Sequence, residues 1–184
     1  MKKINLVLGL CLLMQVGCAE RDTSFLITES SVGPLLNSSV VEDLEKVFAN
    51  DSIVRDSVDP KSGKIQIYRK NGKHLLTITP GSDSIPSIEN IRILDSRYKT
   101  EKGIGLNSTF QDIQNNYSIK KIVTTLNSVV IFPKESNLYF TIDKEELPSN
   151  LRYTSSKIEA VQIPATAKLK YLMLGGSNSE KLAI

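Results

Sequence analysis

The stretch GIGLNSTFQDIQNNY, residues 103–117, decides the fold because the chain contains an earlier stretch built to nearly the same plan. That earlier stretch, VGPLLNSSVVEDLEKVF, covers residues 32–48. In both, a glycine-containing turn leads to Leu-Asn-Ser, and an apolar stripe at helical spacing then ends in an aromatic residue. The two stretches therefore predict two short helices that begin in the same way.

Each helix start carries the spacing of a capping box, in which two side chains satisfy backbone N–H groups of the first turn. Glu42 follows Ser39 by three residues, and Gln111 follows Ser108 by three. The apolar stripes predict the side chains that enter the core, namely Val41, Leu44 and Phe48 in the first helix and Phe110, Ile113 and Tyr117 in the second.

Strand-like segments surround the first helix. Residues 24–28 precede it, and residues 52–58, 64–70, 73–79 and 87–95 follow it. Between the third and fourth of these segments, Asn71 and Gly72 predict a type I′ hairpin turn, which needs two positive φ values.

The second helix is followed by matching segments in the same order. Residues 130–132 match 66–68, and Thr141 with Ile142 matches Thr77 with Ile78, at a constant offset. Loops absorb the remaining drift, chiefly an insertion at 144–160. We therefore predict an α+β fold of two tandem repeats, 24–97 and 98–176. Each would have one helix plus antiparallel strands, the two packed as one compact body, with a flexible tail at 177–184.

The N-terminus predicts export. Lys2 and Lys3 precede an apolar run at 4–14, interrupted by Asn5 and Gly9. This run is shorter than the roughly 20 residues that cross a bilayer as a helix, so residues 1–17 are interpreted as a signal peptide.

Gly17 and Cys18 resemble a bacterial lipobox, in which the cysteine is lipidated and becomes the new N-terminus; Gln15 departs from the usual leucine. The alternative is an ordinary signal peptide with a cysteine there by chance. The resemblance implies a lipidated tether at 18–23, and Ala19 implies sorting to the outer membrane, facing the periplasm. Cys11 would be lost with the signal peptide, which leaves no disulfide.

No catalytic centre stands out. His74 is the sole histidine and is expected to be an exposed polar side chain. Two S-x-x-K strings, Ser96 with Lys99 and Ser118 with Lys121, lack the companion motifs of serine β-lactamases. Gly103 and Gly105 lack the third glycine of a phosphate loop. The carboxylates, Glu42 with Asp43, Glu145 with Glu146, and Asp56 with Asp59, have no calcium-loop or glycosidase context. We expect no cofactor and no metal.

The hairpin at 64–74 is locally basic, with Lys64, Arg69, Lys70, Lys73 and His74. It could bind an anionic partner such as lipid phosphates, or its lysines could discourage strand pairing at a sheet edge. The net charge falls from +3 to +1 without Lys2 and Lys3, so we expect no nucleic-acid partner.

The order of motifs resembles the YfeY-type bacterial lipoproteins, an uncharacterised envelope family. The matching pieces are Cys18, the VGPL turn, the NIRILDS strand, the GIGLNSTFQDI helix start and a closing KLKYL strand. The resemblance implies an outer-membrane lipoprotein and carries no catalytic residue across. More loosely, the pattern looks like the helix-plus-hairpin binding modules of the BamE and β-lactamase-inhibitor-protein type.

These observations predict a lipid-anchored envelope protein that is not an enzyme and that binds or scaffolds another envelope component. Two alternatives remain open: an envelope hydrolase that uses the Ser-Lys pairs or the carboxylates, and a binder of anionic lipid through the basic hairpin.

Overall fold

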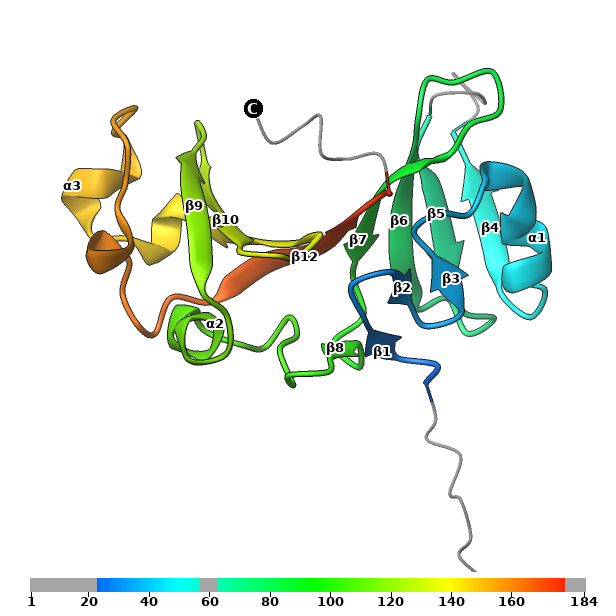
Figure 1. The fold of residues 1–184 in the computed structure, drawn as a ribbon, viewed down its shortest axis with the longest axis horizontal. Helices are drawn as coiled ribbons and strands as arrows, with labels where there is room; N and C mark the ends of the chain where they lie inside the picture. Colours follow the sequence, from blue (N-terminus) through cyan, green and yellow to red (C-terminus); the bar gives the residue numbers. More distant parts are fainter. Residues whose placement is uncertain (1–22, 57–62, 178–184) are drawn as a thin grey trace, which may run out of the picture.

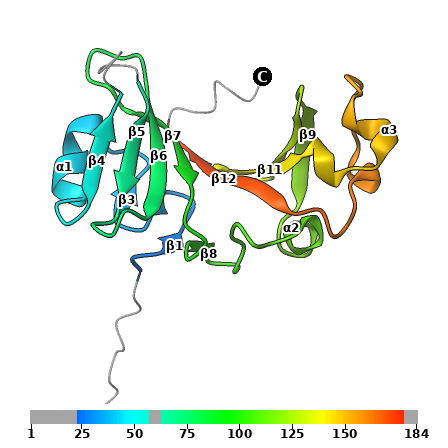
Figure 2. The ribbon, with the colours of Figure 1, turned by 180° about the vertical axis from the view of Figure 1, so that it is seen from behind.

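The computed structural model describes residues 23–56 and 63–177. They form an eight-stranded antiparallel sheet, with a four-stranded mixed sheet and helix α2 on one of its faces (Figures 1 and 2). The α+β class is thus confirmed. The expected signal peptide, the lipid tether up to residue 22 and the tail from residue 178 lie outside the described residues.

The large sheet consists of two four-stranded meanders laid side by side. Its order is β4-β5-β6-β7-β12-β11-β10-β9. The first meander contains β4 (Ser52–Arg55), β5 (Ile65–Tyr68), β6 (His74–Pro80) and β7 (Ile88–Ile93). The second contains β9 (Ile119–Thr124), β10 (Ser128–Pro133), β11 (Leu138–Asp143) and β12 (Leu169–Gly175).

The meanders join where β7 pairs antiparallel with β12. Ile93 lies opposite Leu172 and Ile91 opposite Leu174, and all four side chains are buried. The segments that matched in the sequence fall on corresponding strands, β5 with β10 and β6 with β11. That the two units are copies of one ancestor stays a prediction.

The small sheet ties the start of the described chain to the segment before α2. Its strands are β1 (Leu26–Ile27), β2 (Ser31–Val32), β3 (Leu35–Leu36) and β8 (Lys99–Thr100), with β1 parallel to β8. The turn between β2 and β3 requires Gly33. Its φ is +56°, and a Cβ there would lie 2.5 Å from the Ser24 carbonyl oxygen.

The helices are short. A 3₁₀ turn, η1 (Val41–Asp43), leads into α1 (Leu44–Val47), and α2 spans Phe110–Asn116. The insertion between β11 and β12 holds three more, η2 (Lys144–Glu146), α3 (Ser149–Arg152) and η3 (Ala160–Gln162). No helix among the described residues is long and apolar enough to span a bilayer.

The side-chain contacts of the first turn lie one residue later than predicted in both helices, and only the second helix has a full capping box, because Val40 has no side-chain acceptor. The Val40 N–H donates to Asp43 at 3.4 Å, and the Thr109 N–H donates to Asp112 at 2.8 Å. Ser108 does not cap because its hydroxyl accepts from the Gly105 N–H in the preceding turn. The pairs Ser39 with Glu42 and Ser108 with Gln111 were therefore wrong.

The hairpin turn between β5 and β6 also differs from the prediction. Only Gly72 has a positive φ, +81°, whereas Asn71 does not, so the turn is not type I′. The Gly72 N–H donates to the Arg69 carbonyl at 2.8 Å, and the Asn71 side chain accepts from the Lys73 N–H at 3.2 Å. The asparagine thus stabilises a longer loop, and the strand register shifts beside it.

The predicted helical stripes do enter the core. Leu44, Phe48, Phe110, Ile113 and Tyr117 are buried, whereas Val41 packs against the core while half-buried. The opposite face of the central strands β7, β12 and β11 has no described helix or strand over it (Figures 1 and 2).

The shared β7–β12 seam predicts that the two meanders unfold together. Leu172 is fully buried and lies opposite both Ile93 and Phe140. Leu172→Ala should lower the free energy of unfolding by about 3 kcal/mol and keep a single urea transition, followed by circular dichroism and tyrosine fluorescence. Val54→Ala, on the half-exposed edge strand β4, is the control and should change little. Two separate transitions in the wild-type protein would contradict the prediction.

Candidate functional site

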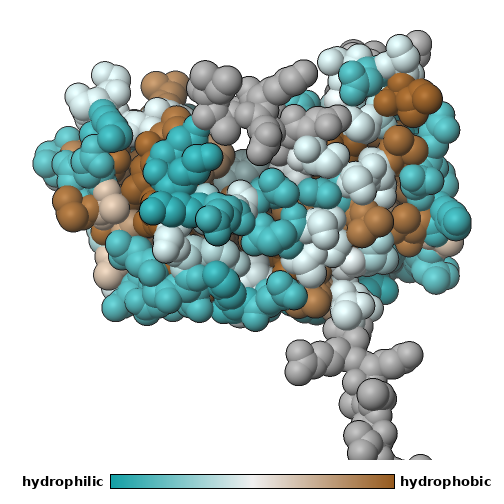
Figure 3. Space-filling model, in the orientation of Figure 1, coloured by the Kyte–Doolittle hydropathy of each residue, from teal (hydrophilic) through white to brown (hydrophobic). Residues whose placement is uncertain are grey.

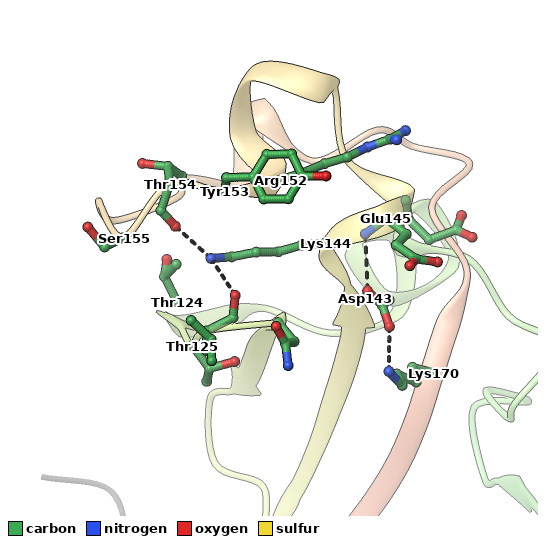
Figure 4. A pocket seen from close by; sticks show the side chains of 13 residues that line it. Thr124, Thr125, Asp143, Lys144, Glu145, Arg152, Tyr153, Thr154, Ser155 and Lys170 are labelled. Carbon is green, nitrogen blue, oxygen red and sulfur yellow. Dashed lines mark hydrogen bonds and ion pairs between the residues drawn. The ribbon is translucent and has the colours of Figure 1, made fainter.

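An open groove of about 1070 Å³ lies at the end of the second meander (Figure 4). Its walls come from the β9–β10 turn, the end of β11, the insertion that holds η2 and α3, and Lys170 of β12. The insertion creates the groove. The chain passes from β6 to β7 through residues 81–87, but from β11 to β12 through residues 144–168.

The buried side chain of Lys144 joins two of the segments that line the groove. Its side chain is almost fully buried, with 3% of the residue exposed, and its ammonium donates to the carbonyls of Leu126 at 3.2 Å and Thr154 at 2.6 Å. Its own N–H donates to the Asn127 carbonyl at 3.0 Å. No described carboxylate lies within 4 Å of the ammonium. A buried charge is costly unless it is compensated, and here two carbonyl dipoles provide the compensation.

The opposite wall contains a formed ion pair. Asp143 pairs with Lys170 and also accepts the Glu145 N–H at 3.1 Å (Figure 4). The hydrogen bond from Lys170 holds the pKa of Asp143 below its usual range, and the same bond raises the pKa of Lys170. Both groups therefore stay charged at neutral pH.

Two large apolar side chains stand at the rim of the groove. Leu126, on the β9–β10 turn, is 85% exposed, and Tyr153, just after α3, is 94% exposed. Apolar surface is visible at the α3 end of the molecule, next to a hydrophilic strip over the lower part of the body (Figure 3). The groove thus combines a charged floor with an apolar rim, which suits binding.

The formal charges of the groove balance. Lys144, Arg152 and Lys170 face Asp143, Glu145 and Glu146. Arg152 donates to the Leu147 carbonyl at 2.9 Å, and Glu146 accepts the Lys168 N–H at 3.0 Å. Across the described residues, no group of three metal-ligating side chains comes together.

The structure separates the residues of the basic hairpin. Lys64 precedes β5, whereas Arg69, Lys70 and Lys73 lie in the turn at the other end of that strand, about 15 Å away by strand rise. Arg69 is not free, because its Nε lies 3.7 Å from Asp51 and its guanidinium stacks 5.5 Å over the Phe25 ring.

The other predicted candidates are dispersed. His74 is half-buried, stacked on Tyr68 with ring centroids 4.3 Å apart, so its expected exposure was wrong; the aromatic neighbour covers it. Ser96 lies in a turn, and Lys121 is in β9, not at a helix start. Neither of these residues lines the groove. Cys18 lies outside the described residues.

A second charged cluster lies between β7 and β8 and packs against Phe25, near the start of the described chain. Arg97 binds the buried carboxylate of Asp95 through bonds as short as 2.7 Å and lies 4.0 Å over the Phe25 ring. Phe25 also packs edge-on against Tyr98 at 5.1 Å. The hydrogen bonds from Arg97 hold the pKa of Asp95 below its usual value, and burial raises the pKa of Tyr98 to about 12.

These features define a small α+β protein with an eight-stranded sheet and an open groove at the end of its second meander. The fold is similar to that in the crystal structure of the uncharacterised protein YfeY from Escherichia coli, with a TM-score of 0.53 and 14% identity. The match covers 81% of this chain and 98% of that chain, and the resemblance noted in the sequence is confirmed for the fold. No family profile and no curated protein sequence matches the chain.

Sequence reasoning missed the groove. The sequence predicted an insertion at 144–160, without indicating that it forms one wall of a groove. One signal was present: the insertion falls in a single loop of an otherwise matching pair of units. Nothing local distinguishes Lys144, which sits between two acidic residues, from an exposed lysine.

Lys144→Met should loosen the insertion, because the Leu126 and Thr154 carbonyls lose their shared donor. We expect a loss of about 2 kcal/mol in unfolding free energy. Amide hydrogen exchange should rise around residues 126 and 154, with β7 unchanged. Lys120→Met, at an exposed position of β9, is the matched control and should leave both measurements at the wild-type level. Equal behaviour of the two variants would show that the buried ammonium does not hold the loops.

The lowered pKa of Asp95 predicts that part of the free energy of unfolding is lost in acid. Because its pKa is lower in the folded protein than in the unfolded chain, the contribution is present above the unfolded pKa, near 4, and is lost as pH falls through the folded value. Asp95→Asn should therefore be less stable than wild type at pH 7, and the difference should shrink toward pH 3 in denaturant titrations. Asp83→Asn, at an exposed loop carboxylate, should keep the wild-type decline. A constant gap between Asp95→Asn and wild type would refute the assignment.

Proposed function

We propose that this chain is a lipid-anchored protein of the bacterial envelope that binds or scaffolds another envelope component and has no enzymatic activity. The observation that carries the anchor is Cys18 after Gly17, at the end of a charged and then apolar leader. Thr23, where the described chain begins, lies five residues further on, so the tether would span at most about 18 Å. The folded body would then be held close to the outer membrane, on its periplasmic side.

The binding role is supported by the groove, which offers a polar floor and an apolar rim without a nucleophile paired to a base. The internal likeness of the two meanders supports an origin by duplication of one helix-plus-strands unit. In this interpretation one unit kept a short β6–β7 loop, and the other acquired the insertion that forms the groove.

Cys18→Ala tests the anchor. The variant should move from the membrane fraction to the soluble periplasmic fraction and should lose incorporation of labelled palmitate. Cys11→Ala is the matched control, because it changes a cysteine within the leader and leaves Gly17 and Cys18 intact. It should stay membrane-bound and labelled. If Cys18→Ala remains in the membrane fraction, the proposed anchor is wrong.

A further inference from the structure

We propose that the groove beside Lys144 is a docking site for an extended peptide segment of a partner protein, one that presents an apolar side chain next to a single carboxylate. This inference rests on the proposed binding function and names the partner's chemistry. Three features of the groove support it: a rim fixed by hydrogen bonds, an unused N–H donor on the Lys144 ammonium, and the position of the groove in the molecule.

The rim is held in place by the buried charge. Lys144 donates to the carbonyl of Leu126 itself and to that of Thr154, the residue after Tyr153. One ammonium therefore fixes the two segments that present Leu126 and Tyr153 to solvent. Tyrosine is enriched among the residues that dominate protein recognition sites, and an exposed leucine beside it on a fixed support extends the apolar surface that a partner could contact.

The ammonium of Lys144 has one hydrogen-bond donor that the described residues do not use. An ammonium has three N–H donors, and the described residues accept two of those of Lys144. A ligand carboxylate could take the third, with the hydroxyls of Thr124 and Ser155 lining the same end of the groove (Figure 4). A doubly charged phosphate fits less well, because exposed Glu145 and Glu146 also line the groove, and neither has an ion-pair partner within 4 Å among the described residues.

The groove is also open to a partner while the protein is anchored. It lies by α3, at the opposite end of the sheet from β4, whereas the chain reaches β1 beneath the first meander (Figure 1). A peptide segment could therefore enter from the periplasm without meeting the segment that leads to the tether.

Selection from a displayed library of random heptapeptides, using the full mature protein in detergent, tests the proposal. Enriched peptides should place a large apolar residue within two positions of Asp or Glu. An enriched peptide should bind Tyr153→Ser and Leu126→Ser at least tenfold more weakly than wild type, measured by fluorescence anisotropy. Replacing its acidic residue by the amide should weaken binding by a similar factor, as should Lys144→Met.

The matched controls are Ile85→Ser and Val54→Ser, which remove exposed apolar side chains from the first meander and its loop. They should bind the peptide as wild type does. Absence of the apolar–acidic pattern among the selected peptides would overturn the proposal, as would equal binding to the rim variants. Either result would leave the proposed lipid anchor untouched, because the anchor is tested separately by fractionation and palmitate labelling of Cys18→Ala.

Discussion

The antiparallel pairing of β7 with β12 is the interaction on which the rest of the structure depends. On its own, each four-stranded meander would have two unpaired edge strands. The pairing of β7 with β12 leaves each meander with one. The side chains on this seam, such as Ile91 and Leu174, lie in a core shared with the small sheet and α2. The parallel pairing of β1 with β8 adds a second link, because it joins the start of the chain to the segment that leads into the second unit. A chain with no cysteine after Cys18 must rely on such packing for cohesion.

The difference between the two halves of the chain bears on where a binding site lies. Each half has a short helix followed by four strands of the large sheet, and such an arrangement specifies architecture without specifying a ligand. The chain differs most between its halves in the connection before the last strand. That connection builds the groove, and it contains the buried ammonium of Lys144 and the exposed ring of Tyr153. Among the described residues, this groove lies in the second half of the chain.

The sequence was sufficient for the class of fold, most strands and the helical core positions, because apolar periodicity reports burial directly. It was less reliable where one polar side chain could bond to more than one backbone group. Ser108 matched a capping position, yet its hydroxyl bonds to the preceding turn and Thr109 caps instead. Asn71 matched a hairpin turn, yet its side chain bonds to Lys73. The groove could not be predicted, because it depends on a lysine meeting carbonyls 18 and 10 residues away in the chain.

The choice of lysine at position 144 follows from what the two loops need. A methionine or leucine could fill the same volume, and burying it would avoid the desolvation of a charge. Such a side chain could not bond to two carbonyls at once, however, and the bonds that Lys144 makes to Leu126 and Thr154 would be lost. A disulfide could join them, but the exported chain is expected to have no cysteine to spare. An ammonium between the Leu126 and Thr154 carbonyls provides the link and leaves one donor over. The same residue therefore both fixes the rim and supplies the charge that a bound carboxylate would meet.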